Sequence, residues 1–194
     1  MRHKIVFPIH TIMIFLIPIC LVISVQASWA KDKIVLENIR LANTRDDLLT
    51  YFTVKGAFTP KITQAVQEGI PTTFSFYVSI YKIKNFWKDQ KIAGIEFSST
   101  IVYNSLKKEY TVTRPWKDPK PSSTKSFEEA RSWMTDIDNV QLVPLQKLIK
   151  DKKYQIRLQA EMDRTILPFY LHNVFFFLSF WDVKTDWYLV NFTY

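Results

Sequence analysis

Residues 154–163 read YQIRLQAEMD, a stretch in which apolar and polar side chains alternate at every position. Successive side chains of a β-strand point to opposite faces, so this pattern puts one face in a core and the other in water. Residues 74–80 and most of 95–103 repeat the alternation, and residues 48–57 and 109–114 are further candidates. The sequence therefore predicts a chain built mainly from strands.

The segments between these strands carry signals for helices and turns. Thr59 followed by Pro60 predicts the start of one helix, which Gly69 would end. Ser126 and Glu129 form a capping box for a second helix, expected to bury side chains as far as Ile137. Residues 115–123 contain three prolines and predict a stiff, exposed loop.

These elements together favour an all-β fold. Residues 34–41 would open a sheet, and a turn at residues 43–47 would join them to the next strand as a hairpin. Pro144 would begin a third short turn that runs through residue 149. We predict an antiparallel two-sheet β-sandwich with two or three short peripheral helices.

The first thirty residues resemble a secretory signal peptide. Arg2 and Lys4 lie before an apolar stretch, and small residues precede the charged Lys31. Cleavage after Ala30 or after Ala27 fits the pattern, and we favour Ala30. An uncleaved inner-membrane anchor is the alternative, since residues 5–25 are long enough to cross a bilayer.

Cleavage would leave residues 31–194 as a single β-sandwich domain without cysteine, because Cys20 is the only one in the chain. The whole chain has a net charge of +8, and the positive charges are dispersed, with the densest run at residues 150–153. No basic stripe points to nucleic acid. Weak attraction to an anionic membrane surface or an acidic partner is the sharper expectation.

The sequence offers little support for catalysis. No glycine cluster could cradle a phosphate, and one histidine, His172, follows residue 30, so no cofactor or metal site is expected. Ser179 and Asp182 or Asp186 could complete a triad with His172, but no strained glycine turn surrounds the serine. We predict a protein that is not an enzyme.

The C-terminal part is rich in aromatic side chains. Residues 174–181 lack alternation and predict a strand buried on both faces, whereas residues 187–194 alternate again. An aromatic patch here could bind a partner or a lipid. The candidate interaction residues are Trp181, Trp187 and Tyr194.

Several short motifs, taken in order, resemble a bacterial exported family catalogued as domain of unknown function 4390. They are Gly56-Ala57-Phe58, the helix from Ala65 to Gly69-Ile70-Pro71, the strand ending near Trp87, Glu129-Ala130, Leu167-Pro168, Phe176-Phe177-Leu178-Ser179 and Thr185-Asp186-Trp187. The candidate structural residues among them are Gly56, Pro71, Thr185 and Asp186. The resemblance implies a periplasmic β domain with no established activity. It also implies genes beside that of a membrane sensor kinase.

These observations favour a periplasmic, non-enzymatic binding module whose partner is a periplasmic or inner-membrane protein, with modulation of a sensor kinase as one expectation. A carrier of an apolar ligand or lipid, held in a pocket between the sheets, is one alternative. A hydrolase of unrecognised type that uses His172 is the other.

Overall fold

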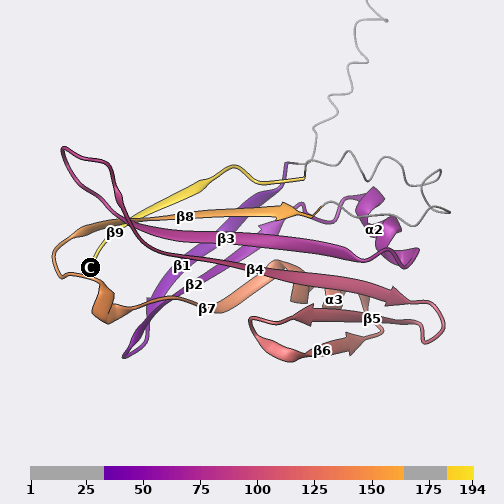
Figure 1. The fold of residues 1–194 in the computed structure, drawn as a ribbon. Coiled ribbons are helices and arrows are strands. Elements are labelled where there is room, and N and C mark those ends of the chain that lie inside the picture. Colours follow the sequence, from indigo (N-terminus) through magenta and orange to yellow (C-terminus); the bar gives the residue numbers. More distant parts are fainter. Residues whose placement is uncertain (1–32, 164–182) are drawn as a thin grey trace, which may run out of the picture. The chain divides into compact units, whose positions relative to one another are not determined.

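The computed structural model describes residues 33–163 and 183–194, which form two antiparallel sheets with helices in the connections (Figure 1). The smaller sheet has the order β1 (Val35–Asn43), β2 (Asp47–Lys55), β7 (Asp136–Pro144). The larger sheet has the order β6 (Asp118–Thr124), β5 (Glu109–Arg114), β4 (Gln90–Asn104), β3 (Thr72–Lys82), β8 (Lys153–Met162), β9 (Tyr188–Thr193). The predicted all-β, two-sheet class is confirmed.

The alternating stretch that decides the fold is β8, which lies between β3 and β9 in the larger sheet. Its apolar residues from Tyr154 to Met162 are buried, and the polar residues between them are half-buried on the opposite face. β3 repeats the arrangement, with Phe76 and Ile80 completely buried. β4 follows it only in part, since Ile101 is buried whereas Phe97 is half-buried.

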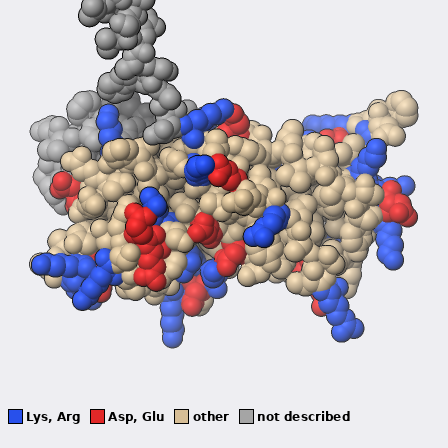
Figure 2. All heavy atoms as spheres, turned by 180° about the vertical axis from the view of Figure 1, so that it is seen from behind, with Lys and Arg blue, Asp and Glu red and all other residues tan. Residues whose placement is uncertain are grey.

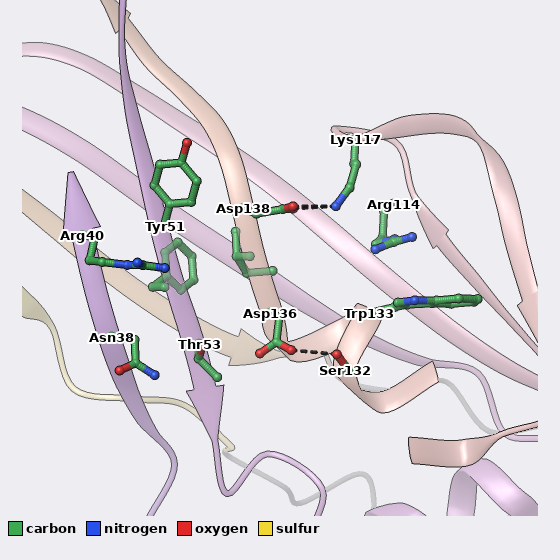
Figure 3. A pocket seen from close by; sticks show the side chains of 12 residues that line it. Asn38, Arg40, Tyr51, Thr53, Arg114, Lys117, Ser132, Trp133, Asp136 and Asp138 are labelled. Carbon is green, nitrogen blue, oxygen red and sulfur yellow. Dashed lines mark hydrogen bonds and ion pairs between the residues drawn. The ribbon is translucent and has the colours of Figure 1, made fainter. Parts of the chain in front are cut away.

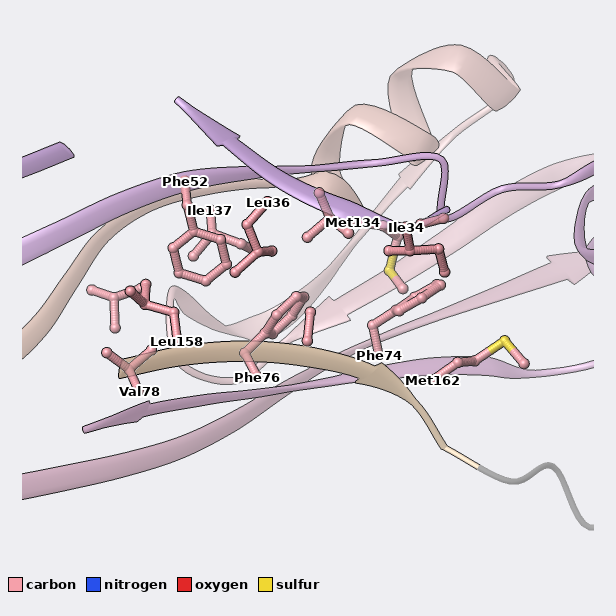
Figure 4. Close-up of a cluster of buried hydrophobic side chains, with 14 of the residues drawn as sticks. Ile34, Leu36, Phe52, Phe74, Phe76, Val78, Met134, Ile137, Leu158 and Met162 are labelled. Carbon is pink, nitrogen blue, oxygen red and sulfur yellow. The ribbon is translucent and has the colours of Figure 1, made fainter. Parts of the chain in front are cut away.

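The core lies between the two sheets (Figure 4). Phe52 of β2 contacts Phe76 of β3 edge to face, with ring centroids 5.8 Å apart, so an aromatic pair links the sheets at the centre. Ile137 of β7 pairs with Phe52 and lies beside it, and Met134 lies farther along the same layer, between Leu36 and Ile34. Burial of these apolar side chains is the main stabilising contribution to the fold.

Two helices and one 3-10 turn occur in the described part of the chain. α2 (Pro60–Gln67) begins as predicted, because the hydroxyl of Thr59 accepts a hydrogen bond from the N–H of Ile62. α3 (Phe127–Thr135) is capped by Ser126, but Glu129 accepts from the Thr124 hydroxyl and does not return to Ser126. The turn predicted from Pro144 is η1 (Leu145–Lys147).

Two predictions about local structure are wrong. Residues 118–124 are not a loop but the edge strand β6, where prolines are tolerated because one side of the strand needs no ladder partner. The second helix does not continue to Ile137: α3 ends at Thr135, and Ile137 is buried in β7. The predicted strand at residues 174–181 lies outside the described residues.

Candidate interaction surface

The face of the larger sheet that points away from the core carries a shallow hollow over β3, β8 and β9. Its volume is about 310 Å³. Because side chains alternate, the residues that line it are the outward-facing neighbours of the buried ones. The residues of this outer patch are Ser79, Tyr81, Gln155, Arg157, Trp187 and Leu189.

Arg157 occupies the centre of the outer patch and is held from three sides. Its guanidinium carbon lies 4.0 Å from the centroid of the Tyr81 ring, within the range of a cation–π contact. Its Nη2 donates to Asp89 at 3.0 Å, and its Nε donates to the side-chain oxygen of Gln155 at 2.8 Å. These contacts fix the side chain before any partner arrives.

Trp187 and Leu189 form the apolar border of the outer patch. They are 52% and 57% exposed. Leu189 pairs with Arg157 across the β8–β9 ladder, so apolar surface and a positioned cation are adjacent. Protein interfaces concentrate their binding free energy in tryptophan, tyrosine and arginine side chains of this kind.

The segment before β9 is fixed by two of the predicted structural residues. Thr185 is buried, its hydroxyl accepts from the N–H of Ala160 at 3.1 Å, and its carbonyl accepts from Gln159. Asp186 is exposed, and its carboxylate forms an ion pair with Lys33 at 2.5 Å, which raises the pKa of the lysine. Thr185 therefore binds the backbone of β8, whereas the carboxylate of Asp186 binds a lysine side chain. Both residues immediately precede Trp187 and fix the backbone from which it projects.

The other predicted interaction residues do not join this surface. Tyr194 is half-buried and packs against the core, on the opposite side of β9 from Leu189. Trp181 lies outside the described residues. Of the three aromatic candidates, the structure therefore places one, Trp187, on the exposed outer patch.

Gly56 and Pro71 have structural positions away from the outer patch. Gly56 follows β2 with a φ of +76°, and a Cβ there would lie 3.1 Å from the carbonyl oxygen of Lys33. This is the bend and close approach that glycine permits. Pro71 is exposed and directly precedes β3, where its restricted backbone leads into an extended conformation.

A second hollow, of about 460 Å³, lies beside the smaller sheet and is lined by both polar and aromatic side chains (Figure 3). Arg40 of β1 lies over the Tyr51 ring, and Arg114 at the end of β5 lies over the Trp133 ring, at 5.9 and 5.4 Å. Burial lowers the pKa of Arg114. This groove brings cations and aromatic rings together from both sheets and α3.

The acidic groups of the groove already have partners. Lys117 donates to Asp138 at 2.7 Å, and Ser132 donates to Asp136 at 2.7 Å (Figure 3). Asp138 therefore offsets the charge of Lys117, and Asp136 is bound by a neutral hydroxyl. No residue that lines the groove is a large apolar side chain exposed by half or more, whereas Trp187 and Leu189 of the outer patch are.

Catalytic groups are sparse in the described part of the chain. His172, Ser179 and Asp182 lie outside it, so the predicted triad has no described geometry. Glu161 accepts a hydrogen bond from the hydroxyl of Tyr77 at 2.9 Å, and this bond is the main cause that raises the pKa of Tyr77 to about 12. Residues 33–163 and 183–194 contain no cluster of three or more acidic, histidine or cysteine side chains that could hold a metal ion.

The order of motifs along the chain agrees with comparison to known families. Residues 31–191 match the model of the family described as Domain of unknown function (DUF4390). The chain belongs to this family. Neither the comparison with curated proteins nor that with solved structures returned a match for this DUF4390 chain. Membership of this family does not assign an activity to the chain.

Sequence reasoning found Trp187 but missed the rest of the outer patch. Tyr81 continues the β3 alternation on its outward side, and Arg157 lies at an outward position of β8. Both positions could be read from the period of two. What the sequence could not show is the pairing of β3, β8 and β9, which brings the three strands together.

Proposed function

We propose that this protein is a non-enzymatic interaction module of the periplasm that binds a periplasmic or inner-membrane protein through the outer patch. The observation that carries the proposal is the juxtaposition of exposed Trp187 and Leu189 with an immobilised Arg157. Immobilised side chains lose less conformational entropy when a partner binds, so more of the contact energy contributes to affinity.

The chemistry of the outer patch indicates what the partner presents. Two nitrogens of Arg157 donate to Asp89 and Gln155, whereas Nη1 has no hydrogen-bond partner among residues 33–163 and 183–194. The patch would therefore accept an apolar side chain beside Trp187 and an oxygen acceptor at Arg157. An extended or helical segment that carries one apolar anchor and one carboxylate or carbonyl fits this surface.

The location of the protein is part of the proposal. The basic and apolar N-terminal segment supports export, with cleavage after Ala30 or Ala27 and an uncleaved anchor as the alternative. No helix of the described residues is long and apolar enough to cross a membrane. An inner-membrane sensor kinase is the first partner to test, because the family resemblance implies neighbouring genes.

Co-purification from intact envelopes tests the proposal. The wild type is compared with the double variant Trp187→Ala/Leu189→Ser. The control variant is Lys120→Ala, which changes an exposed residue of β6 at the opposite edge of the sheet. We expect the double variant to lose a partner that the wild type and the control retain, at unchanged thermal stability. Equal capture by all three proteins would exclude the outer patch as the binding surface.

The His172→Ala variant separates binding from hydrolysis. A binding module should retain full function in a deletion strain when the imidazole is removed, because no proton transfer depends on it. Loss of complementation by a variant with wild-type stability would instead favour the hydrolase. Stability is measured on the same preparations, so that an unfolded variant is recognised.

A further inference from the structure

The hairpin that joins β3 to β4 ends in two adjacent aromatic side chains. Phe86 is 96% exposed and Trp87 is 80% exposed, the highest values among the large aromatic residues in the described ranges. No ring contact in those ranges involves either residue. Because exposing such rings to water is unfavourable, their position at a loop tip indicates that they are buried in a partner or a membrane when the protein functions.

Lysine residues surround this aromatic tip. Lys82, Lys84, Lys88 and Lys91 flank it within the hairpin, where the single acid, Asp89, is neutralised by Arg157. The hairpin therefore combines a strongly basic collar with an apolar end.

A second basic segment lies beside the hairpin. The N–H of Ile83 donates to the carbonyl of Lys153 at 2.9 Å, which continues the β3–β8 ladder past its last pair. This contact brings residues 150–153, the densest basic run of the sequence, next to the tip, together with the half-exposed Ile149. At the end of the molecule that carries this hairpin, on the right in Figure 2, blue side chains surround a tan projection.

The base of the hairpin is rigid. Asp89, two residues after Trp87, is bound to Arg157, which itself lies on the Tyr81 ring. β3 and β4 pair from Thr72 with Ile101 to Lys82 with Gln90, with one register shift between Ile80 and Tyr81. The tip therefore projects from a fixed base, so it would lose little conformational entropy when it inserts into a membrane.

We infer that the β3–β4 tip is a membrane-docking element that inserts Phe86 and Trp87 into the interface of an anionic phospholipid bilayer. Tryptophan and phenylalanine partition into the headgroup region, and surrounding lysines bind anionic lipids. The surface fits a lipid interface better than a protein, because its two aromatic side chains project at a loop tip that is flanked mainly by lysines. The hollow of about 480 Å³ beside the tip is itself lined mostly by lysines, with Asp151 as its one acid. This site is separate from the outer patch and does not depend on the proposed protein partner.

Vesicle co-sedimentation tests the inference with the protein as the cell makes it. Vesicles contain phosphatidylethanolamine with 30 mol% phosphatidylglycerol in one arm, a composition chosen at roughly the anionic content that lysine collars respond to. Phosphatidylcholine alone is the other arm. The variants are Phe86→Ser/Trp87→Ser and the control Leu106→Ser, which removes an apolar side chain that is 94% exposed at the opposite end of β4, beside Lys107 and Lys108.

We expect the tip variant to bind anionic vesicles at least about tenfold more weakly than wild type, whereas the Leu106→Ser control binds as wild type does. Binding should weaken with added salt and be lower on phosphatidylcholine, because the lysine contribution is electrostatic. Equal vesicle binding by the tip variant and the wild type would overturn the inference. The inference would also be overturned if neither the wild type nor any variant bound vesicles and the tip variant failed to capture a protein that the wild type captures.

The two proposals fail in different ways. Trp187→Ala/Leu189→Ser should retain vesicle binding, and Phe86→Ser/Trp87→Ser should retain the captured partner. An uncleaved N-terminal apolar segment would hold every variant on the vesicles alike, so the comparison uses protein whose intact mass shows that this segment has been removed. Both tip residues are exposed, so thermal unfolding curves should match the wild type.

Discussion

Thr185 satisfies both backbone hydrogen-bonding groups of Ala160: its N–H donates to the Ala160 carbonyl at 2.9 Å, and its hydroxyl accepts from the Ala160 N–H at 3.1 Å. Thr185 thereby continues the ladder beyond the last β8–β9 pair, Leu158 with Tyr188, and the N–H of Met162 extends it further by donating to the carbonyl of Val183 at 2.8 Å. Because Thr185 is almost completely buried, this contact fixes the chain two residues before Trp187.

Replacing Thr185 by valine keeps the shape of the side chain but leaves the buried N–H of Ala160 without a partner. We expect the free energy of unfolding to fall by about 1–3 kcal/mol. Urea denaturation measures the change. Thr185→Ser retains the accepting oxygen and should lose less; a serine variant less stable than the valine variant would contradict the assignment.

The alternation of the strands predicts a large loss of stability for a substitution on the inner face of β8 and a small loss for one on the outer face of β9. Leu158→Ala removes a fully buried side chain and should cost about 2–5 kcal/mol in the free energy of unfolding. Leu189→Ala, on the neighbouring strand but facing outward, should change it by about 0.5 kcal/mol or less. Chemical denaturation of both variants checks the faces, and similar losses at both positions would refute them.

Local pattern predicted the strands that are half-buried and the helices that have caps. β8 follows its alternation throughout, and Thr59 with Pro60 places the first residue of α2. β6 was not predicted because Asp118–Thr124 has no alternating apolar residues, and it forms a strand only through its pairing with β5. β7 was not predicted because it follows α3 without a turn residue. Ile137 fits the apolar face of the helix as well as the buried face of the strand.

The candidate surface could be predicted only in part for a related reason. Trp187 is visible as an aromatic residue at the start of an alternating stretch, but its exposure depends on which strands surround it. The β3–β4 tip had a local signal that was overlooked: Phe86 and Trp87 interrupt the alternation between Lys84 and Lys88.

Gly56 is required by its backbone conformation. Its φ of +76° disfavours any residue with a Cβ, and the carbonyl of Lys33 lies close to where that atom would be. Gly56→Ala should lower the free energy of unfolding by about 1–2 kcal/mol. Gly94→Ala is the control, because its new Cβ meets the flexible end of Lys91, and thermal melts should show no comparable loss.

The hydrogen bond from Tyr77 to Glu161 predicts a dependence on alkaline pH. The bond raises the pKa of Tyr77 to about 12 from an ordinary value of 10.0. The stabilisation is therefore complete below pH 10 and is lost as pH rises toward 12, where the folded protein must also give up the proton. Stability measured from pH 9 to 12 should fall less steeply in Tyr77→Phe than in the wild type, and equal slopes would contradict this.

Site-specific photo-cross-linking at position 189 tests the central claim, that the outer patch binds a protein partner. A photoreactive residue replaces Leu189 in one protein and Lys120, on the far edge strand β6, in another, and both are irradiated in intact cells. The account predicts a discrete cross-linked protein from position 189 that disappears in the Trp187→Ala background, with none from position 120. Absence of a cross-link at position 189, or the same product from both positions, would contradict it.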